Sequence, residues 1–202
     1  MGENRFKVIS IREYLGGEDD GLGEDDLEPV LSGFSCGKNA DVERFLKEQA
    51  VNFAKKHQSV TYLVFGNEDA ALLGYFSITI KPITVSAAPF SNSMRRKLAR
   101  VASFNDAEET YNLAAYLIAQ IGKNDADGTD GRILGDELLD LAMEQIYRMQ
   151  YIAGGMVVFL EAVDHPKVVA FYERNRFYQF SVRQVQDGSS EPMKLIQMLR
   201  IL

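Results

Sequence analysis

Apolar and polar residues recur along this chain with two different periods, and the two periods alternate. Short runs rich in β-branched and aromatic residues predict strands at 6–11, 60–65, 71–80, 113–121, 156–161, 178–185 and 194–199. Apolar residues at helical spacing predict helices at 39–57, 136–150 and 164–175. We expect Asn39 and Asp164 to cap helices and Pro82 to end a strand. This order predicts one mixed α/β domain over residues 1–202.

The net charge is concentrated in one short segment. The chain has 22 Lys+Arg against 29 Asp+Glu, a net of −7. Seven of the acids lie between Glu18 and Glu28, where there is no base, so the remainder is balanced at 22 against 22. We therefore expect residues 16–28 to form a solvated acidic loop, which is inert, binds a basic partner or repels nucleic acid.

Several classes of protein are excluded by composition. No apolar run approaches the ~20 residues of a membrane helix, and the first residues have no apolar signal-peptide core. The single cysteine, Cys36, allows no internal disulfide and is expected to be a small buried group. With only His57 and His165 besides, no metal centre is expected. We expect a soluble cytoplasmic protein.

Residues 81–108 have little periodicity and form a basic insertion. It carries four clustered bases, Arg95, Arg96, Lys97 and Arg100, which we expect on a helical turn or short helix. Such a cluster is either a solvated helical face or a grip on RNA phosphates.

A glycine-bearing loop before the helix at 136–150 is the first candidate site. Its residues are Gly131, Arg132, Ile133, Leu134, Gly135 and Asp136. A helix start offers unpaired backbone N–H groups that bind phosphate, and an arginine adds a charge-assisted bond. The alternative is a simple helix start. The loop matches neither a Walker A nor a Gly-x-Gly-x-x-Gly sequence.

Three parts of the chain carry a family resemblance: residues 131–139, residues 170–177, and the set 34–46, 61–64 and 74–78. Together they resemble the GNAT acetyltransferases, which bind acetyl-coenzyme A. Residues 131–139 resemble the family's pyrophosphate loop and following helix, and residues 170–177 (AFYERNRF) resemble its late A-F-Y-E-x-x-G-F stretch. The segments 34–46, 61–64 and 74–78 resemble a branch that includes tRNA-acetylating toxins. The resemblance covers most of the chain and implies a GNAT fold: a mixed central sheet with a splayed parallel strand pair, flanked by helices.

The same resemblance implies the site residues. Tyr172 matches the family tyrosine that protonates the leaving thiolate. A tyrosine suits this role, because a phenol of pKa ~10 stays protonated at neutral pH. Ile121, Gly122 and Lys123 match the strand whose backbone pairs with the pantetheine arm. Residues 131–136 match the pyrophosphate loop, where Asp130 and Ile133 depart from the family's usual residues. In the late stretch, Arg176 stands where the family often has glycine. Glu161 and Asp164 are the candidate general bases, and a water chain is the alternative.

The implied function is acetyl transfer from acetyl-coenzyme A, as co-substrate, to a primary amine. A small molecule, a protein amine and aminoacyl-tRNA remain open as acceptors, the last through the basic cluster. The alternative is a GNAT-shaped coenzyme A-binding or regulatory module without turnover. A homodimer is one open oligomeric state. No metal and no membrane contact are expected.

Overall fold

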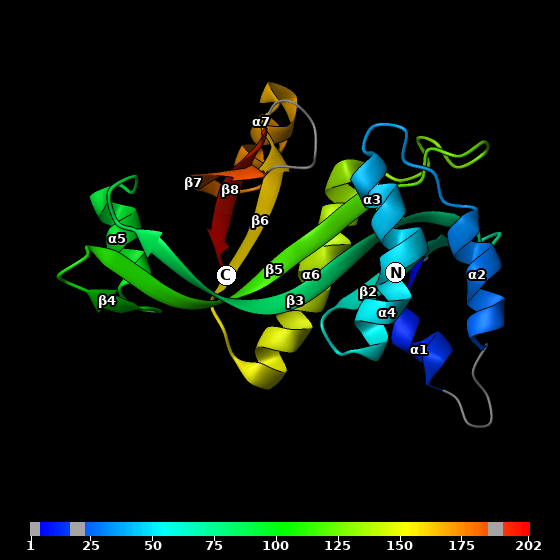
Figure 1. Ribbon diagram of the computed structural model, residues 1–202, viewed down its shortest axis with the longest axis horizontal. Helices are drawn as coiled ribbons and strands as arrows, with labels where there is room; N and C mark the ends of the chain where they lie inside the picture. Colours follow the sequence, from blue (N-terminus) through cyan, green and yellow to red (C-terminus); the bar gives the residue numbers. More distant parts are fainter. Residues whose placement is uncertain (1–4, 17–22, 186–191) are drawn as a thin grey trace. The chain divides into compact units, whose positions relative to one another are not determined.

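A computed structural model describes residues 5–16, 23–185 and 192–202 of the chain (Figure 1). These residues belong to two compact units. Unit 1 comprises Met1–Thr79 and Ile118–Ile146, and unit 2 comprises Ile80–Leu117 and Tyr147–Leu202. Among the described residues the strands form one sheet in the order β1-β2-β3-β5-β6-β8-β7, with β4 paired to β5. Strands β3 and β5 contribute to both units.

Unit 1 packs its helices around a core of aliphatic and aromatic side chains. Strand β2 pairs antiparallel with both β1 and β3. The buried cluster includes Leu27, Phe34, Leu46 and Tyr75. The elements are β1 Phe6–Ser10, α1 Ile11–Leu15, α2 Glu24–Ser32, α3 Ala40–Arg44, η1 Phe45–Gln49, α4 Ala50–Lys55, β2 Val60–Gly66, the first part of β3 Leu72–Ser86, the second part of β5 Thr110–Lys123 and most of α6 Gly135–Ala153.

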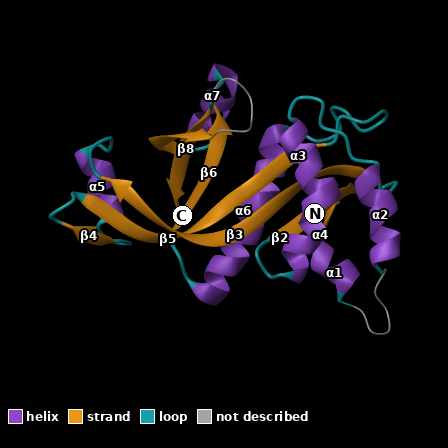
Figure 2. Ribbon diagram, in the orientation of Figure 1, coloured by secondary structure: helices purple, strands orange, loops and turns teal. Residues whose placement is uncertain are grey.

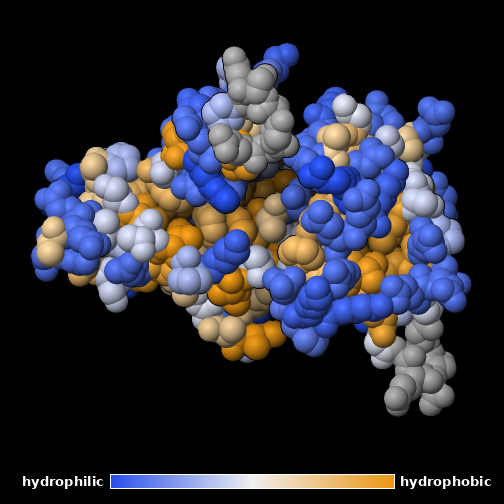
Figure 3. Space-filling view, in the orientation of Figure 1, coloured by the Kyte–Doolittle hydropathy of each residue, from blue (hydrophilic) through white to orange (hydrophobic). Residues whose placement is uncertain are grey.

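Unit 2 has its own core, which is built around Phe90, Leu98, Phe159 and Leu199. Strand β8 pairs antiparallel with β6 on one side and β7 on the other. Figure 2 shows helix α7 next to β6 and β8. The C-terminal end of α6 leaves Ile152 83% exposed, which gives an apolar patch on the surface (Figure 3). The elements are the rest of β3 and β5, α5 Asn92–Leu98, β4 Ser103–Asn105, the end of α6, β6 Val157–Val163, α7 Pro166–Arg174, β7 Tyr178–Val185 and β8 Met193–Ile201.

Each predicted strand and helix is present in the structure, and the fold class is confirmed. Asn39 caps the first long helix as predicted, through its side-chain oxygen and the N–H groups of Asp41 and Val42. That helix is not continuous, because a π-helical segment at 45–49 widens it. The hydroxyl of Tyr75 donates to the Val42 carbonyl (2.5 Å) just before this wide turn. No helix among the described residues has the length and apolarity to span a membrane.

Three local predictions are wrong. Strand β3 continues past Pro82 to Ser86, because β2 pairs with it only as far as Ile78 and proline is tolerated on an open strand edge. Residues 24–28 of the predicted acidic loop begin α2. Three acids in its first turn stabilise the helix, because they lie at the positive end of the helix dipole. Residues 17–22 of that loop lie outside the described residues. His165 rather than Asp164 caps α7, and the Asp164 carboxylate pairs with Lys194 (2.8 Å).

Gly122 in β5 allows α3 to approach the sheet closely. A Cβ at this position would overlap Val42 Cγ1 of α3 and lie 3.5 Å from the Phe34 ring. The requirement is therefore steric, since Gly122 has no positive φ.

We predict that Gly122→Ala lowers the free energy of unfolding by about 1–3 kcal/mol, because the extra methyl overpacks a filled site. Urea denaturation of the full chain measures this loss. Gly37→Ala is the matched control, since a Cβ there meets nothing within 4 Å. The Gly122→Ala/Val42→Ala double variant should recover part of the loss. Equal stability of Gly122→Ala and the wild type would contradict the packing.

Candidate functional site

The predicted pyrophosphate loop leads into the first turn of α6 in unit 1. Gly131 has φ of +75°, a conformation that favours glycine. Ile133, which replaces the family's middle glycine, is 1% exposed and is not among the residues with positive φ. Its side chain therefore belongs to the core while the backbone continues into the helix. The N–H of Arg132 donates to the Thr129 carbonyl (3.2 Å) and closes a turn ahead of the helix.

Arg132 is bound to a carboxylate of the β2–β3 turn. Its guanidinium makes two parallel hydrogen bonds to Asp69, Nη1 to Oδ2 at 2.8 Å and Nη2 to Oδ1 at 2.9 Å. This bidentate contact, together with the N–H of Ala71, lowers the pKa of Asp69 to about 2. The guanidinium also lies over Gly66, where a Cβ would come within 2.9 Å of Nη2. The arginine expected to meet a phosphate is thus paired within the chain.

A second carboxylate bonds to the loop at the start of α6. Glu137 Oε2 accepts the N–H of Leu134 (2.8 Å), while its Oε1 pairs with Arg5 (2.7 Å). The Glu137 carboxylate thus accepts one backbone N–H of the helix start from within the protein. A phosphate at this loop would therefore depend on the other N–H groups of the first turn.

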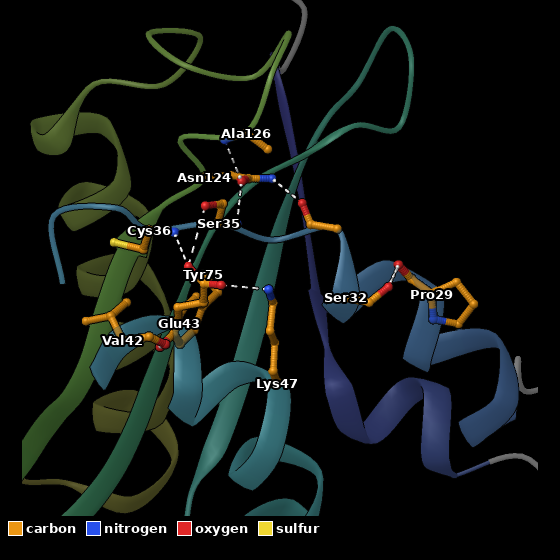
Figure 4. A network of polar contacts seen from close by, with 11 residues as sticks. Pro29, Ser32, Ser35, Cys36, Val42, Glu43, Lys47, Tyr75, Asn124 and Ala126 are labelled. Carbon is orange, nitrogen blue, oxygen red and sulfur yellow. Dashed lines mark hydrogen bonds and ion pairs between the residues drawn. The ribbon is translucent and has the colours of Figure 1, made fainter. Parts of the chain in front are cut away.

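The strand end predicted to face the pantetheine arm lies beside this loop in unit 1. Gly122 is buried, whereas Ile121 and Lys123 are partly exposed. Asn124 follows directly and is 3% exposed, with side-chain bonds to the backbone of Ser35, Leu72 and Ala126. Figure 4 shows Asn124 beside Ser35 and Ala126. The role of Asn124 was not predicted, because a polar residue between Lys123 and Asp125 has the pattern of an exposed loop.

Tyr172 lies on α7 in unit 2 and is 8% exposed. Burial raises the pKa of Tyr172 to about 12, so its hydroxyl stays protonated at neutral pH and is a weaker acid than a free phenol. Its ring makes edge contacts with Phe171 and Phe177 at centroid distances of 4.9 and 5.8 Å. The Tyr172 carbonyl accepts the N–H of Phe177 (3.0 Å) in a helix-ending turn whose left-handed residue, at φ +66°, is Arg176.

The two candidate bases of unit 2 are both ion-paired. Glu161 accepts from Arg183 (3.1 and 3.2 Å) and from Gln197 (2.8 Å), and Asp164 pairs with Lys194. Cys36 is buried, as expected, and burial raises the pKa of its thiol. Within the described ranges no three His, Cys, Asp or Glu side chains gather as a metal site.

The basic cluster forms a short helix, as predicted. Residues 92–98 make up α5 in unit 2, where Arg95 Nε donates to the Phe90 carbonyl (3.1 Å), while Arg96, Lys97 and Arg100 are exposed. A hollow of about 490 Å³ is lined by Lys97, Phe90 and Met94 together with residues 177–179 at the start of β7.

Charge is divided unequally between the units. By sequence, unit 1 has 10 Lys+Arg against 21 Asp+Glu, a net of −11, and unit 2 has 12 against 8, a net of +4. The balance found outside the acidic segment thus conceals two opposite surpluses. The predicted coenzyme loop and strand end belong to the acidic unit, whereas Tyr172 and the basic cluster belong to the basic unit.

We predict that Asp69 remains ionised far below the ordinary carboxyl range. Because its pKa is lowered, the contact with Arg132 stabilises the fold fully above the ordinary pKa of 3.8 and is lost as the pH falls through about 2. Carbon-13 NMR of the Asp69 carboxyl measures the midpoint, and Arg132→Ala should return it toward 3.8. An ordinary midpoint in the wild type would show that the pair does not persist in solution.

Solved structures of known proteins share the fold of this chain. Neither the scan of protein-family models nor the search of curated proteins gives a match. Among solved structures, AtaT complexed with acetyl-methionyl-tRNAfMet has a TM-score of 0.61 at 16% identity, over 95% of this chain and 93% of that one. A tyrosine-to-phenylalanine variant of KacT has a TM-score of 0.60 at 17% identity, over 96% and 95%.

A similar variant of AtaT, bound to the C-terminus of the antitoxin AtaR and to acetyl-CoA, has a TM-score of 0.55 at 14% identity, over 96% of this chain and 94% of that one. These identities are low, and the likeness is one of fold. The resemblance found in the sequence is thereby confirmed at the level of three-dimensional structure. The chain has the GNAT fold of the AtaT and KacT toxins.

Proposed function

We propose that the chain is an N-acetyltransferase that moves an acetyl group from acetyl-coenzyme A to a primary amine. The observation that carries the proposal is the fold shared with AtaT over 95% of the chain, because structures of that toxin contain acetyl-CoA and an acetylated aminoacyl-tRNA. The buried, protonated tyrosine on α7 supports the same reaction.

The reaction makes three chemical demands. A neutral amine nitrogen attacks the thioester carbonyl, the carbonyl oxygen takes up negative charge, and the carbon–sulfur bond breaks to release a thiolate. We assign binding of the coenzyme to the strand end Ile121, Gly122 and Lys123 and to the loop residues 131–136. The first-turn N–H groups of α6 meet the pyrophosphate, and a backbone N–H of β5 stabilises the oxyanion.

Tyr172 is assigned as the general acid. Its hydroxyl gives a proton to the leaving thiolate, and the proton released by the attacking amine restores the phenol through water. Because burial raises the pKa of Tyr172 to about 12, the phenol is fully protonated over the whole neutral range. The weak acid favours proton donation after the carbon–sulfur bond has begun to break.

We predict that Tyr172→Phe lowers kcat by about 10²–10⁴-fold and leaves acetyl-coenzyme A affinity within about threefold, since only the proton donor is removed. A steady-state assay measures kcat, and calorimetry measures affinity. Tyr178→Phe is the matched control, because Tyr178 is 49% exposed and lies outside α7. Unchanged turnover in Tyr172→Phe would remove this tyrosine from the mechanism.

We assign aminoacyl-tRNA as the favoured acceptor. Arg96, Lys97 and Arg100 are exposed and lie on the unit with net positive charge. A phosphate-rich acceptor is attracted to such a surface and a small amine is not.

We predict that replacing Arg96, Lys97 and Arg100 by glutamine weakens binding of an aminoacyl-tRNA about 10-fold or more and flattens its dependence on salt concentration. Filter binding across a salt series measures both effects, with Lys167→Gln, an exposed change on α7, as the control. Turnover of a small amine should not change. Unchanged RNA binding, or an equal loss of turnover with the small amine and with the aminoacyl-tRNA, would contradict an RNA-binding surface at α5.

The second candidate function is a GNAT-shaped module that does not turn over. It is favoured by the bidentate Arg132–Asp69 contact and by the Glu137 carboxylate on the Leu134 N–H, which occupy groups expected to meet phosphate. Coenzyme binding without acetyl transfer across small amines, protein amines and aminoacyl-tRNA would establish this function instead.

A further inference from the structure

We propose that Asn124 is a positioning residue that holds the coenzyme loop and the end of β5 in place by fastening both to the segment Ser35–Cys36. The inference rests on the proposed function, because it concerns the same coenzyme site. All of the contacts that carry it lie within unit 1 (Figure 4).

The side chain of Asn124 joins three separate parts of the chain. Its Oδ1 accepts the N–H of Ser35 at 2.9 Å and the N–H of Ala126 at 3.1 Å. Its Nδ2 donates to the carbonyl of Leu72, at the start of β3, at 2.8 Å. A longer contact of 3.5 Å reaches the carbonyl of Gly33. The amide therefore uses both its acceptor and its donors in a site that is 3% exposed.

Backbone hydrogen bonds of Asn124 and Asp125 join the same segments of the chain. The N–H of Asn124 donates to the Leu73 carbonyl (2.8 Å), and the N–H of Asp125 donates to the Ser35 carbonyl (2.7 Å). Ser35 is thus bonded on both its N–H and its carbonyl to residues that directly follow β5. In the next turn, the Thr129 hydroxyl donates to the carbonyls of Asn124 (3.3 Å) and Ala126 (2.7 Å). This turn leads into the loop at 131–136.

The segment Ser35–Cys36 is held from its other side by helix α3. Glu43 Oε2 accepts the N–H of Cys36 (2.8 Å) and contacts the Ser35 hydroxyl (3.5 Å), while Oε1 pairs with Lys47 (2.7 Å). These bonds lower the pKa of Glu43, so its carboxylate stays ionised near neutral pH. Figure 4 shows Glu43 and Asn124 bonded to the same segment.

Only an asparagine meets the demands at position 124. An aspartate keeps the shape and the acceptor but presents an oxygen to the Leu72 carbonyl, where the amide presents a donor. An alanine leaves two backbone N–H groups and one carbonyl without their side-chain partner in a buried site. Either change releases the turn before the loop, so that the loop residues 131–136 no longer lie where they would bind the coenzyme.

Hydrogen exchange tests the positioning without any coenzyme. In Asn124→Ala and Asn124→Asp we expect the amides of Ser35 and Ala126 to exchange at least about 10-fold faster than in the wild type, because their acceptor is removed or displaced. Amides of β2 and of α6 beyond its first turn should be unchanged. Asn52→Asp, an exposed change on α4, is the matched control. Unchanged exchange in both Asn124 variants overturns the inference.

Calorimetry with acetyl-coenzyme A then tests the consequence for binding. We expect a loss of affinity of about 10-fold or more in Asn124→Asp, with kcat at saturating coenzyme changed far less than KM, because the reacting groups are untouched. Glu43→Gln, which releases Ser35–Cys36 from the α3 side, should also weaken binding, and its effect should not add fully to that of Asn124→Asp. This second variant keeps the inference testable if the Asn124 variants fold poorly.

The two failures are distinguishable. A wild-type chain that does not bind acetyl-coenzyme A overturns the proposed function and this inference with it. A wild-type chain that binds, with Asn124 variants that bind equally well, overturns only the positioning role. A fall in kcat with no change in KM or affinity also overturns it, because positioning of the coenzyme is read in binding.

Discussion

Unit 1 depends on one buried amide, because Asn124 connects segments that are distant in the sequence. Its side chain fastens the turn after β5 to the start of β3 and to the segment between α2 and α3. The steric fit at Gly122, two residues earlier, sets how closely α3 approaches the same strand end. Together they fix the end of β5, from which the loop into α6 continues.

The candidate coenzyme loop lies in a unit whose net charge is unfavourable for an anionic ligand. The unit that contains the candidate coenzyme loop has a net charge of −11, although coenzyme A is itself an anion. Attraction between opposite charges would therefore contribute little to the proposed coenzyme binding, which relies on short-range contacts between backbone N–H groups and phosphate. The basic unit, by contrast, carries α5 and Tyr172. The net positive charge of this unit is consistent with the proposed aminoacyl-tRNA acceptor, which is a polyanion.

Much of the fold was predictable from the sequence, because the two hydrophobic periods and the residue stretches 131–139 and 170–177 are local signals. The tertiary partners were not. Arg132 has the pattern of a phosphate ligand, and only the β2–β3 turn brings Asp69 to it. Likewise the first acids of α2 have the composition of a loop, and helix formation there follows from the burial of Leu27 and Leu31. The role of Asn124 arises from contacts with distant segments, at Ser35 and Leu72. The His165 cap is local, since its side chain accepts the N–H of Lys167, and here the sequence offered Asp164 as an equally suitable cap.

Calorimetric titration of the full chain with acetyl-coenzyme A, at low and high salt, tests the central claim most directly. The account predicts saturable binding of one coenzyme per chain, and an affinity that does not fall as salt rises, because screening weakens the repulsion from unit 1. Absence of binding at both salt concentrations would contradict the assignment of the coenzyme site. An affinity that falls steeply with salt would contradict the view that backbone contacts, rather than paired charges, hold the phosphates.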